Sequence, residues 1–263
     1  MTTGLRGDLA GKIVLVTGGS QGVGGAAARR AAEWGAAGLV ICGRDPDKGA
    51  RAAAAIEAGG TRCVFVAADL ADTAACARVL QACDSSFGRL DCLVNAAAST
   101  DRGGLLDATA EFMDRQYAVN VRAPFLLMQG AARLMRRDGA HGTMVNVLSM
   151  NAHCGTPELA VYSATKGAMA TLTRNAANTL LPDRIRVNGI NLGWVDTPAE
   201  HVVQERTSPD GADWLVKGAA RQPFGRLIDV EELADLIAFL LSRHSGLMTG
   251  ALIDYEQRVL GAP

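Results

Sequence analysis

Three residues in the second half of the chain have types and spacing that suit proton transfer. Ser149 precedes Tyr162 by 13 positions, and Lys166 follows Tyr162 at i+4. Positions i and i+4 of a helix share one face, so the phenol and the ammonium project side by side. A phenol with a reference pKa of about 10 is a poor acid or base near neutral pH unless its surroundings change that value.

The lysine supplies such a change. An ammonium about 4.5 Å from the phenol, at an effective dielectric of about 20, favours the phenolate by roughly 3–4 kcal/mol. That energy is worth about two to three pKa units, which brings Tyr162 toward working pH. Ser149 can then hydrogen-bond a substrate oxygen while Tyr162 gives or takes its proton. Because Tyr-x-x-x-Lys alone is common by chance, the interpretation needs a second motif.

A glycine-rich segment near the start of the chain is that second motif. It follows the apolar run 13–16 and precedes a helical pattern, in a context typical of dinucleotide-binding turns. Glycine lets the backbone turn sharply and bring its N–H groups against a pyrophosphate, and the helix N-terminus favours the anion. The alternative is a tight strand–helix turn without a ligand. The predicted cofactor contacts here are Thr17, Gly18, Ser20, Gln21, Gly22, Val23 and Gly24.

The end of the next predicted strand bears on which dinucleotide binds. An NAD-preferring enzyme usually places a carboxylate there, on the ribose 2′-OH. Gly43 stands at that position, and Arg44 offers a planar guanidinium suited to a phosphate, so NADP is favoured over NAD. Two alternatives stay open: Asp45 is the acid if the register differs by one or two, and Arg44 is a solvated surface charge.

Asp69-Leu70 close the third predicted strand and are expected to contact the adenine. Asp69 has a second possible role, capping the helix that begins near Thr73.

Short apolar runs alternate with alanine-rich helical stretches along the whole chain. Several runs are apolar without alternation, which predicts strands covered on both faces and therefore parallel. The pattern predicts an α/β fold: a Rossmann-type doubly wound parallel sheet of about seven strands, with helices on both faces in three αβα layers. The predicted strands are 12–16, 39–42, 63–66, 90–94, 142–148, 184–191 and 251–254, and the predicted helices are 23–34, 47–58, 73–87, 111–136, 162–180 and 230–242.

We expect residues 1–263 to form a single domain, because no repeat, low-complexity linker or charge block marks a boundary. One long region, 193–223, is expected to be irregular, since Pro198, Pro209, Gly211 and Gly218 break its periodicity. A connection of that length inside a compact domain is usually functional, so it is predicted to be a mobile flap over the substrate.

Composition excludes several classes of protein. Hydrophobic residues make up 49% of the 263 residues and charged residues 20%, enough to bury a large core. The net charge of -1 argues against a nucleic-acid partner. No apolar stretch approaches the roughly 18 to 20 residues of a membrane helix, and no signal peptide is expected. The six cysteines form no metal or disulfide pattern, which predicts buried thiols, no catalytic metal and a cytoplasmic location.

Taken together, these residues resemble the single-domain short-chain dehydrogenase/reductase family over essentially the whole chain. The matching landmarks are Thr17-Gly18 with Gly22-Val23-Gly24, Asp69-Leu70, Leu93-Val94-Asn95-Ala96-Ala97, Asn120-Val121, Val145-Asn146-Val147-Leu148-Ser149, Tyr162-Ser163-Ala164-Thr165-Lys166, Arg186-Val187-Asn188, Gly193-Trp194-Val195-Asp196-Thr197 and Pro223-Phe224-Gly225-Arg226.

The resemblance implies a catalytic tetrad of Asn120, Ser149, Tyr162 and Lys166, in which the asparagine holds a water that links the lysine to solvent. On its own, Asn120 could equally be a helix-kink or capping residue. The resemblance also implies that Lys166 holds the nicotinamide ribose. Other cofactor contacts implied by it are Asn95, Ala96, Tyr162, Gly193, Val195 and Thr197, and it implies a homo-oligomer, either a tetramer or a dimer.

The chain departs from the family pattern at three places. Ala98 replaces a usual glycine, and Leu192-Gly193 replaces Pro-Gly, which is expected to loosen that turn. The tail reads Asp254-Tyr255-Glu256-Gln257-Arg258 where Asp-Gly-Gly is common. Such tails lie at subunit interfaces in this family, and an interface role is favoured here over substrate selection.

The predicted reaction is hydride transfer between a nicotinamide cofactor and a secondary alcohol or ketone. The segments 150–157 and 194–214 are expected over the reacting carbon and offer polar groups, which favour a sugar or polyol. The alternatives are a 3-oxoacyl thioester, a cyclic ketone, or a catalytically idle dinucleotide-binding regulator. His153 could instead be satisfied by loop backbone. The predicted substrate contacts are Ser149, Asn151, His153, Trp194 and His201.

Overall fold

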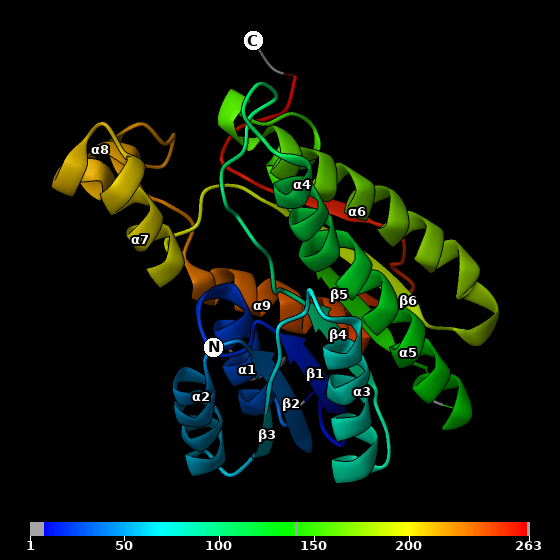
Figure 1. Cartoon of the computed structure of the whole chain (residues 1–263). Helices are drawn as coiled ribbons and strands as arrows, with labels where there is room; N and C mark the ends of the chain where they lie inside the picture. Colours follow the sequence, from blue (N-terminus) through cyan, green and yellow to red (C-terminus); the bar gives the residue numbers. More distant parts are fainter. Residues whose placement is uncertain (1–7, 140, 262–263) are drawn as a thin grey trace.

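The computed structural model describes residues 8–139 and 141–261, which are built around one parallel sheet (Figure 1). Its strand order is β3-β2-β1-β4-β5-β6-β7, and every neighbouring pair is parallel. The order reverses between β1 and β4, which is the point where ligands bind in doubly wound sheets. The strands are β1 (Ile13–Thr17), β2 (Gly38–Gly43), β3 (Arg62–Ala67), β4 (Cys92–Asn95), β5 (Thr143–Val147), β6 (Arg186–Leu192) and β7 (Leu252–Tyr255).

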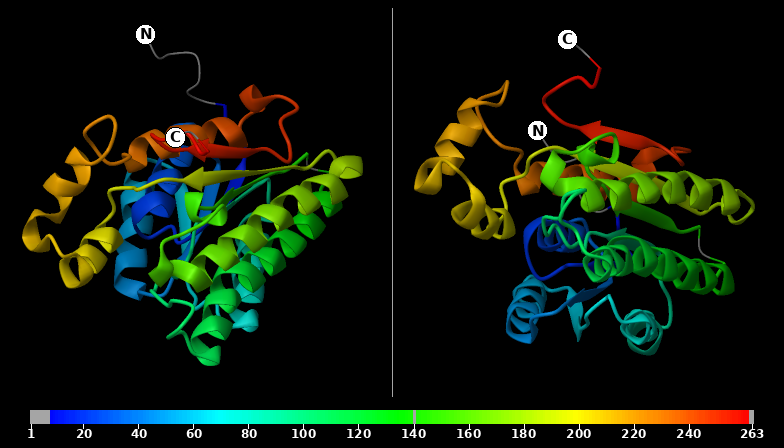
Figure 2. Two further views of the ribbon diagram at one scale, coloured as in Figure 1. Left: turned by 90° about the horizontal axis from the view of Figure 1, so that it is seen from above. Right: turned by 45° about the horizontal axis from the view of Figure 1, so that its top comes forward.

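Helices cover both faces of the sheet, so the predicted three-layer fold is confirmed (Figures 1 and 2). Buried residues of α1, α2 and α9 pack on one face, and those of α3, α5 and α6 pack on the other. The helices are α1 (Gly22–Glu33), α2 (Pro46–Ala58), α3 (Thr73–Phe87), α4 (Ala110–Tyr117), α5 (Ala123–Arg137), α6 (Ala160–Thr179), α7 (Pro198–Thr207), α8 (Trp214–Ala220) and α9 (Val230–Leu241).

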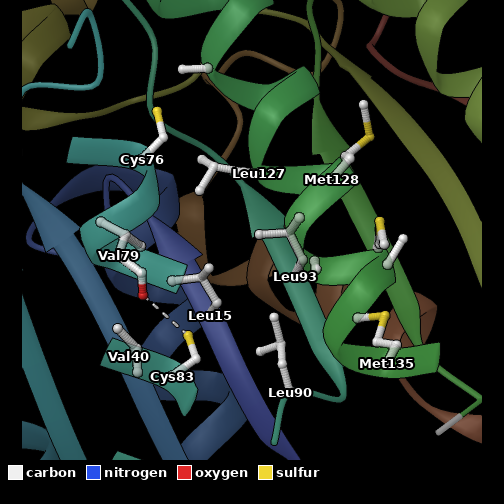
Figure 3. Packing of buried hydrophobic residues seen from close by; sticks show 14 of the residues in the cluster. Leu15, Val40, Cys76, Val79, Cys83, Leu90, Leu93, Leu127, Met128 and Met135 are labelled. Atoms are coloured by element: carbon white, nitrogen blue, oxygen red, sulfur yellow. Dashed lines mark hydrogen bonds between the residues drawn. The ribbon is translucent and has the colours of Figure 1, made fainter. Parts of the chain in front are cut away.

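The buried strands explain the two-sided core. All five residues of β1 are buried, and they alternate between the two apolar clusters: Ile13 and Leu15 join one, Val14 and Val16 the other. Figure 3 shows the first cluster, where Leu15 and Leu93 from the sheet meet side chains of α3 and α5. Each large aliphatic side chain buried in this way stabilises the fold by about 1.5–3 kcal/mol.

Five of the six cysteines are buried, as the sequence predicts. Burial raises the pKa of Cys42 and Cys83 to about 12, so both stay thiols at neutral pH. The Cys83 thiol donates a hydrogen bond to the Val79 carbonyl (Figure 3). These cysteines act as small apolar residues of the core.

The helical segment predicted over 111–136 is confirmed, with one local difference inside it. The structure has α4, a π-helical turn at Ala118–Arg122, and then α5. Asn120 lies in that turn, where its buried side chain bonds groups outside the helix. A π turn adds a residue to the helical ladder without removing an apolar position, so hydrophobic periodicity did not reveal it.

The sequence prediction of an irregular segment over 193–223 is wrong, because the segment contains α7 and α8. Pro198 begins α7 instead of breaking it, since proline is well suited to the first helical position. Thr197 caps that helix by accepting a hydrogen bond from the Glu200 N–H at 3.1 Å. Figures 1 and 2 show α7 and α8 projecting from the side of the molecule. We call residues 194–220 the flap.

None of the helices in the described ranges is both apolar and long enough to cross a lipid bilayer.

Candidate active site

Ser149, Tyr162 and Lys166 come together at the carboxyl end of β5. Ser149 follows that strand, and Tyr162 lies in the first turn of α6, close enough to Ser149 for that hydroxyl to influence the pKa of the phenol. The Lys166 ammonium lies 5.5 Å from the centre of the Tyr162 ring and donates a hydrogen bond to the Val147 carbonyl at 2.8 Å. Ser149 is 8% exposed and Lys166 is 4% exposed, so both groups are shielded from bulk water.

The charge states of this site differ from the sequence expectation. Burial raises the pKa of Tyr162 to about 12, although the Ser149 hydroxyl acts in the opposite direction. Burial also lowers the pKa of Lys166 to about 8. The expected net lowering of the tyrosine pKa by the lysine is therefore wrong for these side chains. Desolvation disfavours both charged forms, and the lysine is bonded to a backbone carbonyl.

Asn120 is held by four hydrogen bonds, one of which connects it to α6. Its Nδ2 donates to the Ser99 carbonyl at 2.9 Å, to Gln116 Oε1 at 2.8 Å and to Thr165 Oγ1 at 3.1 Å. Its Oδ1 accepts from the Ser99 N–H at 2.8 Å. Thr165, which accepts one of these bonds, is the residue before Lys166 in α6. Asn120 therefore lies in the π turn and also contacts the residue that precedes Lys166.

The glycine loop has the geometry of a close anion cradle. Gly18 and Gly22 have φ of +66° and +55°, the left-handed region that favours glycine. A Cβ on Gly24 would overlap the Gly18 carbonyl. Thr17 Oγ1 accepts hydrogen bonds from the Ala96 and Ala97 N–H groups at 3.0 and 3.1 Å, which fixes the loop against the end of β4. Asn95 is buried there and donates to Asn146 Oδ1.

The end of β2 is close to the glycine loop, so a side chain at position 43 would require Ser20 to move. A Cβ on Gly43 would lie 2.9 Å from the Ser20 hydroxyl oxygen. Asp45 caps α2 by accepting hydrogen bonds from the Asp47 and Lys48 N–H groups, both at 3.0 Å, and these bonds hold the pKa of its carboxyl below the usual value. Asp45 is therefore engaged in the helix cap.

Two basic residues near this point were missed by the sequence analysis. Lys48 and Arg51 line a cavity of about 260 Å³ together with Ser20 and Arg29. Lys48 also donates a hydrogen bond to Gln21 Oε1 at 3.3 Å. Their spacing after Arg44, at i+4 and i+7, is the helical signal that could have shown them on one face.

The alternative role for Asp69 as a helix cap is wrong, because Asp72 caps α3. Asp69 instead accepts a hydrogen bond from the Ala71 N–H at 3.0 Å and pairs with Arg115 at 3.1 Å. Leu70, which follows it, is buried. Both residues lie beyond the end of β3.

The segment after β6 lies against the glycine loop. The methyl carbon of Thr197 is 3.7 Å from the position of a Cβ on Gly22. Val195 forms an isolated parallel bridge with Ile228, and the Gly193 N–H donates to the Tyr255 carbonyl at 2.9 Å. Leu192 pairs with Tyr255 of β7 in the sheet. The Leu192-Gly193 turn, which the sequence analysis expected to be loose, therefore begins at a paired strand residue.

The predicted substrate contacts fall into two groups. His153 Nε2 lies 3.4 Å from Asp254 Oδ1 and 3.4 Å from Asn191 Nδ2, so its ring faces side chains and not loop backbone. It shares the loop after Ser149 with Asn151, whose N–H donates to the Ser149 hydroxyl at 3.2 Å.

Trp194 and His201 form the second group, on the flap. Their neighbour Trp214 is buried, 6.0 Å from the Trp194 ring and 4.9 Å from His201. His201 Nε2 lies 2.7 Å from Asp196 Oδ1. Trp194 Nε1 donates at 2.8 Å to Glu200, a residue that the sequence analysis did not identify.

Comparison with known proteins agrees with the parallel-sheet fold. A family model described as "Enoyl-(Acyl carrier protein) reductase" matches residues 18–256. An uncharacterized oxidoreductase of Thermotoga maritima is 35% identical over 94% of this chain and 96% of its own length. L-xylulose reductase of Bos taurus is 35% identical over 94% of this chain and 96% of its own length.

A solved structure gives the same result at the level of the fold. L-sorbose reductase of Gluconobacter frateurii, complexed with NADPH and L-sorbose, is 28% identical, with a TM-score of 0.90 over 98% of this chain and all of that one. The chain belongs to the short-chain dehydrogenase/reductase family. It is an oxidoreductase that acts on secondary alcohols or ketones with a nicotinamide cofactor.

Proposed function

We propose that this protein is an NADP-dependent reductase of hydroxylated ketones, with Asn120, Ser149, Tyr162 and Lys166 as its catalytic residues. The observation that carries the proposal is the convergence of Tyr162 with the buried Ser149 and Lys166 at the end of β5, with the Lys166 ammonium 5.5 Å from the centre of the Tyr162 ring. The residues present fit a dinucleotide, because added Cβ atoms would fill the cradle at Gly18 and Gly24.

In the proposed mechanism, Ser149 donates a hydrogen bond to the substrate oxygen and fixes it beside Tyr162. Tyr162 gives its phenol proton to that oxygen in the reduction and takes it back in the oxidation. The raised pKa of Tyr162 keeps this proton on the phenol at neutral pH, the form needed for reduction. The cofactor supplies the hydride and, when oxidised, a positive charge near the phenol. Lys166 holds the nicotinamide ribose, and Asn120 supports the solvent link to Lys166.

The remaining predicted cofactor residues bind the other parts of the dinucleotide in this proposal. Thr17, Gly18, Ser20, Gln21, Gly22, Val23 and Gly24 bind the pyrophosphate region, and Asp69 and Leu70 flank the adenine. The nicotinamide half contacts the ends of β4 and β6 through Asn95, Ala96, Gly193, Val195 and Thr197 in this proposal.

The preference for NADP over NAD is supported by the groups around the end of β2. Arg44, Lys48 and Arg51 are three cations on or beside the first turns of α2, and Asp45 is engaged as the cap of that helix. We expect Arg44→Ala to weaken NADPH binding by about 10- to 100-fold, the value of a hydrogen bond to a charged group, and NADH binding far less. Titration calorimetry with both cofactors tests this, with the exposed Arg78→Ala as control. Equal losses for the two cofactors would contradict the 2′-phosphate proposal.

A sugar-like or polyol substrate is supported by the named relatives, L-xylulose reductase and L-sorbose reductase. The runner-up classes are a 3-oxoacyl thioester and a cyclic ketone. The description of the matching family model names an acyl carrier protein thioester, but an enoyl and not a 3-oxoacyl one. A panel of ketoses, polyols, cyclic ketones and acyl thioesters, followed through absorbance of the reduced cofactor, separates them. Turnover confined to thioesters would overturn the proposal.

The proposal includes a homo-oligomer, either a tetramer or a dimer. It is supported by a cavity of about 590 Å³ on the outer side of α4 and α5, which Tyr117, Val121, Phe125 and Leu172 line in part. Light scattering of the purified protein measures its mass directly. We also propose a cytoplasmic location and a single domain with a mobile flap, as the sequence predicts.

A further inference from the structure

Glu200 is a fixed carboxylate in the first turn of α7, where the flap leaves the sheet. Its Oε1 accepts hydrogen bonds from Trp194 Nε1 at 2.8 Å and from Gln204 Nε2 at 2.6 Å. Its backbone N–H donates to Thr197 Oγ1 at 3.1 Å. None of these bonds uses Oε2. The side chain is therefore held in one orientation with one oxygen left to accept from a ligand.

Glu200 lies close to two segments of the predicted site. Its partner Trp194 stands two residues after the end of β6, and Thr197, which caps the same helix turn, contacts the glycine loop near Gly22. The negative charge of Glu200 is close enough to Tyr162 to help raise the pKa of the phenol. The charged groups that face Tyr162 are Lys166 from α6 and Glu200 from α7.

In the part of the chain that the structure describes, no positively charged side chain forms an ion pair with the Glu200 carboxylate. His201 is the next residue, but its Nε2 lies 2.7 Å from Asp196 Oδ1. Lys217 on α8 pairs with Asp210 and Asp213. The partners of Glu200 are thus an indole and an amide, which donate hydrogen bonds without cancelling its charge.

We propose that Glu200 is a specificity-determining residue that accepts a hydrogen bond from a hydroxyl next to the reacting carbonyl and disfavours substrates with a negative charge near that carbon. This inference rests on the proposed function and narrows it to neutral α-hydroxy ketones and their vicinal diols. A site built to accept from a substrate hydroxyl loses that bond with the deoxy analogue, and like charges repel strongly where water is partly excluded.

Three small ketones and two variants test the inference. The ketones are 3-hydroxybutan-2-one, which has the hydroxyl, butan-2-one, which lacks it, and acetoacetate, which is anionic. Glu200→Gln keeps an oxygen for Trp194 and Gln204 but removes the charge. Glu205→Gln makes the same change at an exposed position of the same helix and is the matched control.

For Glu200→Gln we expect kcat/KM with 3-hydroxybutan-2-one to fall about tenfold relative to each of the other two ketones. The Glu205→Gln ratios should equal those of the parent, and both variants should keep the parent affinity for NADPH. Unchanged ratios in Glu200→Gln would overturn the inference. A parent enzyme without preference for the hydroxy ketone would overturn it as well.

The pH profile is a second readout that a purely structural role would not move. In the oxidation of butane-2,3-diol, kcat/KM rises with pH as the Tyr162 phenol loses its proton. Without the negative charge of Glu200, that rise should move to lower pH by roughly half a unit, while Glu205→Gln leaves it in place. An unmoved profile in Glu200→Gln would overturn the electrostatic part. Failure of the parent on the whole wider substrate panel would instead overturn the proposed function.

Discussion

At the scale of single residues, burial leaves Tyr162 and Lys166 both inclined to be neutral. The phenol pKa rises to about 12 and the lysine pKa falls to about 8, because each charged form loses hydration inside the same pocket. At pH 7 the phenol keeps its proton and the lysine keeps its charge. This pairing suits an enzyme that donates a proton to a ketone oxygen.

Tyr162→Phe removes the proton donor but little of the pocket. We expect turnover to fall by about 10²- to 10⁴-fold, the usual contribution of general acid–base catalysis, with NADPH affinity nearly unchanged. Steady-state rates and cofactor titration measure the two quantities separately. A variant that turns over like the parent would show that another group supplies the proton.

Lys166→Met should make the protein more stable at pH 7. The folded-state pKa of Lys166 is about 8 against an ordinary 10.5, so protonating it below pH 8 costs up to about 3 kcal/mol of folding free energy. Losing its hydrogen bond to Val147 offsets part of the gain, which leaves about 1–3 kcal/mol.

The sign of the pH dependence follows from proton uptake. Between pH 8 and 10.5 the unfolded lysine holds a proton that the folded one has lost, so the stability of the parent rises with pH in that window. Lys166→Met should lack that rise, whereas the exposed Lys217→Met should keep it. Urea denaturation at pH 7, 8, 9 and 10 gives both curves. A variant less stable than the parent at pH 7 would contradict the argument.

The sequence alone could place Ser149, Tyr162 and Lys166 together, because helical spacing and a strand end fix their relative positions. It could not give the pKa direction, because spacing sets a distance and says nothing about desolvation. Glu200 was missed for a related reason. Its closeness to Tyr162 depends on the chain path from Gly193 to Thr197, where no periodic pattern exists.

At the scale of elements, all seven strands were predictable from short apolar runs. Burial on both faces accounts for the central strands, such as β1 and β4, whereas β3 and β7 are partly exposed. The two helices that the sequence analysis missed are α7 and α8, whose start and end signals are local and polar. Pro198 was interpreted as a breaker, yet it begins α7, whereas Gly211 does separate α7 from α8, with a φ of +57°. The π turn at Asn120 was invisible for lack of any change in composition.

The C-terminal tail, residues 254–258, bonds the chain just before the flap and just after it. The Tyr255 carbonyl accepts from the Gly193 N–H at the start of the flap. Beyond its other end, Gln257 accepts from the Phe224 N–H at 2.9 Å and donates to the Arg226 carbonyl at 2.6 Å. The tail, one of the departures from the family pattern, thus bonds residues on either side of the flap in its own chain.

Gln257→Ala should therefore loosen the flap without touching the catalytic groups. We expect KM for the ketone to rise severalfold, with smaller changes in kcat and in NADPH affinity, because two hydrogen bonds worth about 1 kcal/mol each are lost. Cleavage by a protease near 208–211 should become faster. Gln81→Ala, on the exposed side of α3, is the control. Unchanged KM and cleavage rate would show that the tail does not position the flap.

At the scale of the whole molecule, the proposed cofactor site draws on distant parts of the chain. Its residues come from the glycine loop after β1, from the ends of β2 and β4, from α6 and from the segment after β6. These elements belong to both sides of the point where the strand order reverses. A ligand that contacts all of them binds only the folded chain, so its binding energy adds to the stability of the entire fold.

NADPH should accordingly raise the melting temperature more than NADH at equal concentration. At 100 times its Kd, a ligand adds about 2.7 kcal/mol, which for a chain of this size raises Tm by roughly 5–10 °C. Because the proposed preference comes from the 2′-phosphate, the difference between the two cofactors should largely vanish in Arg44→Ala and persist in Arg78→Ala. Scanning calorimetry over a series of cofactor concentrations measures both shifts. An NADH shift equal to or larger than that of NADPH would mean that the cations of α2 face solvent and not a phosphate, whatever the catalytic residues do.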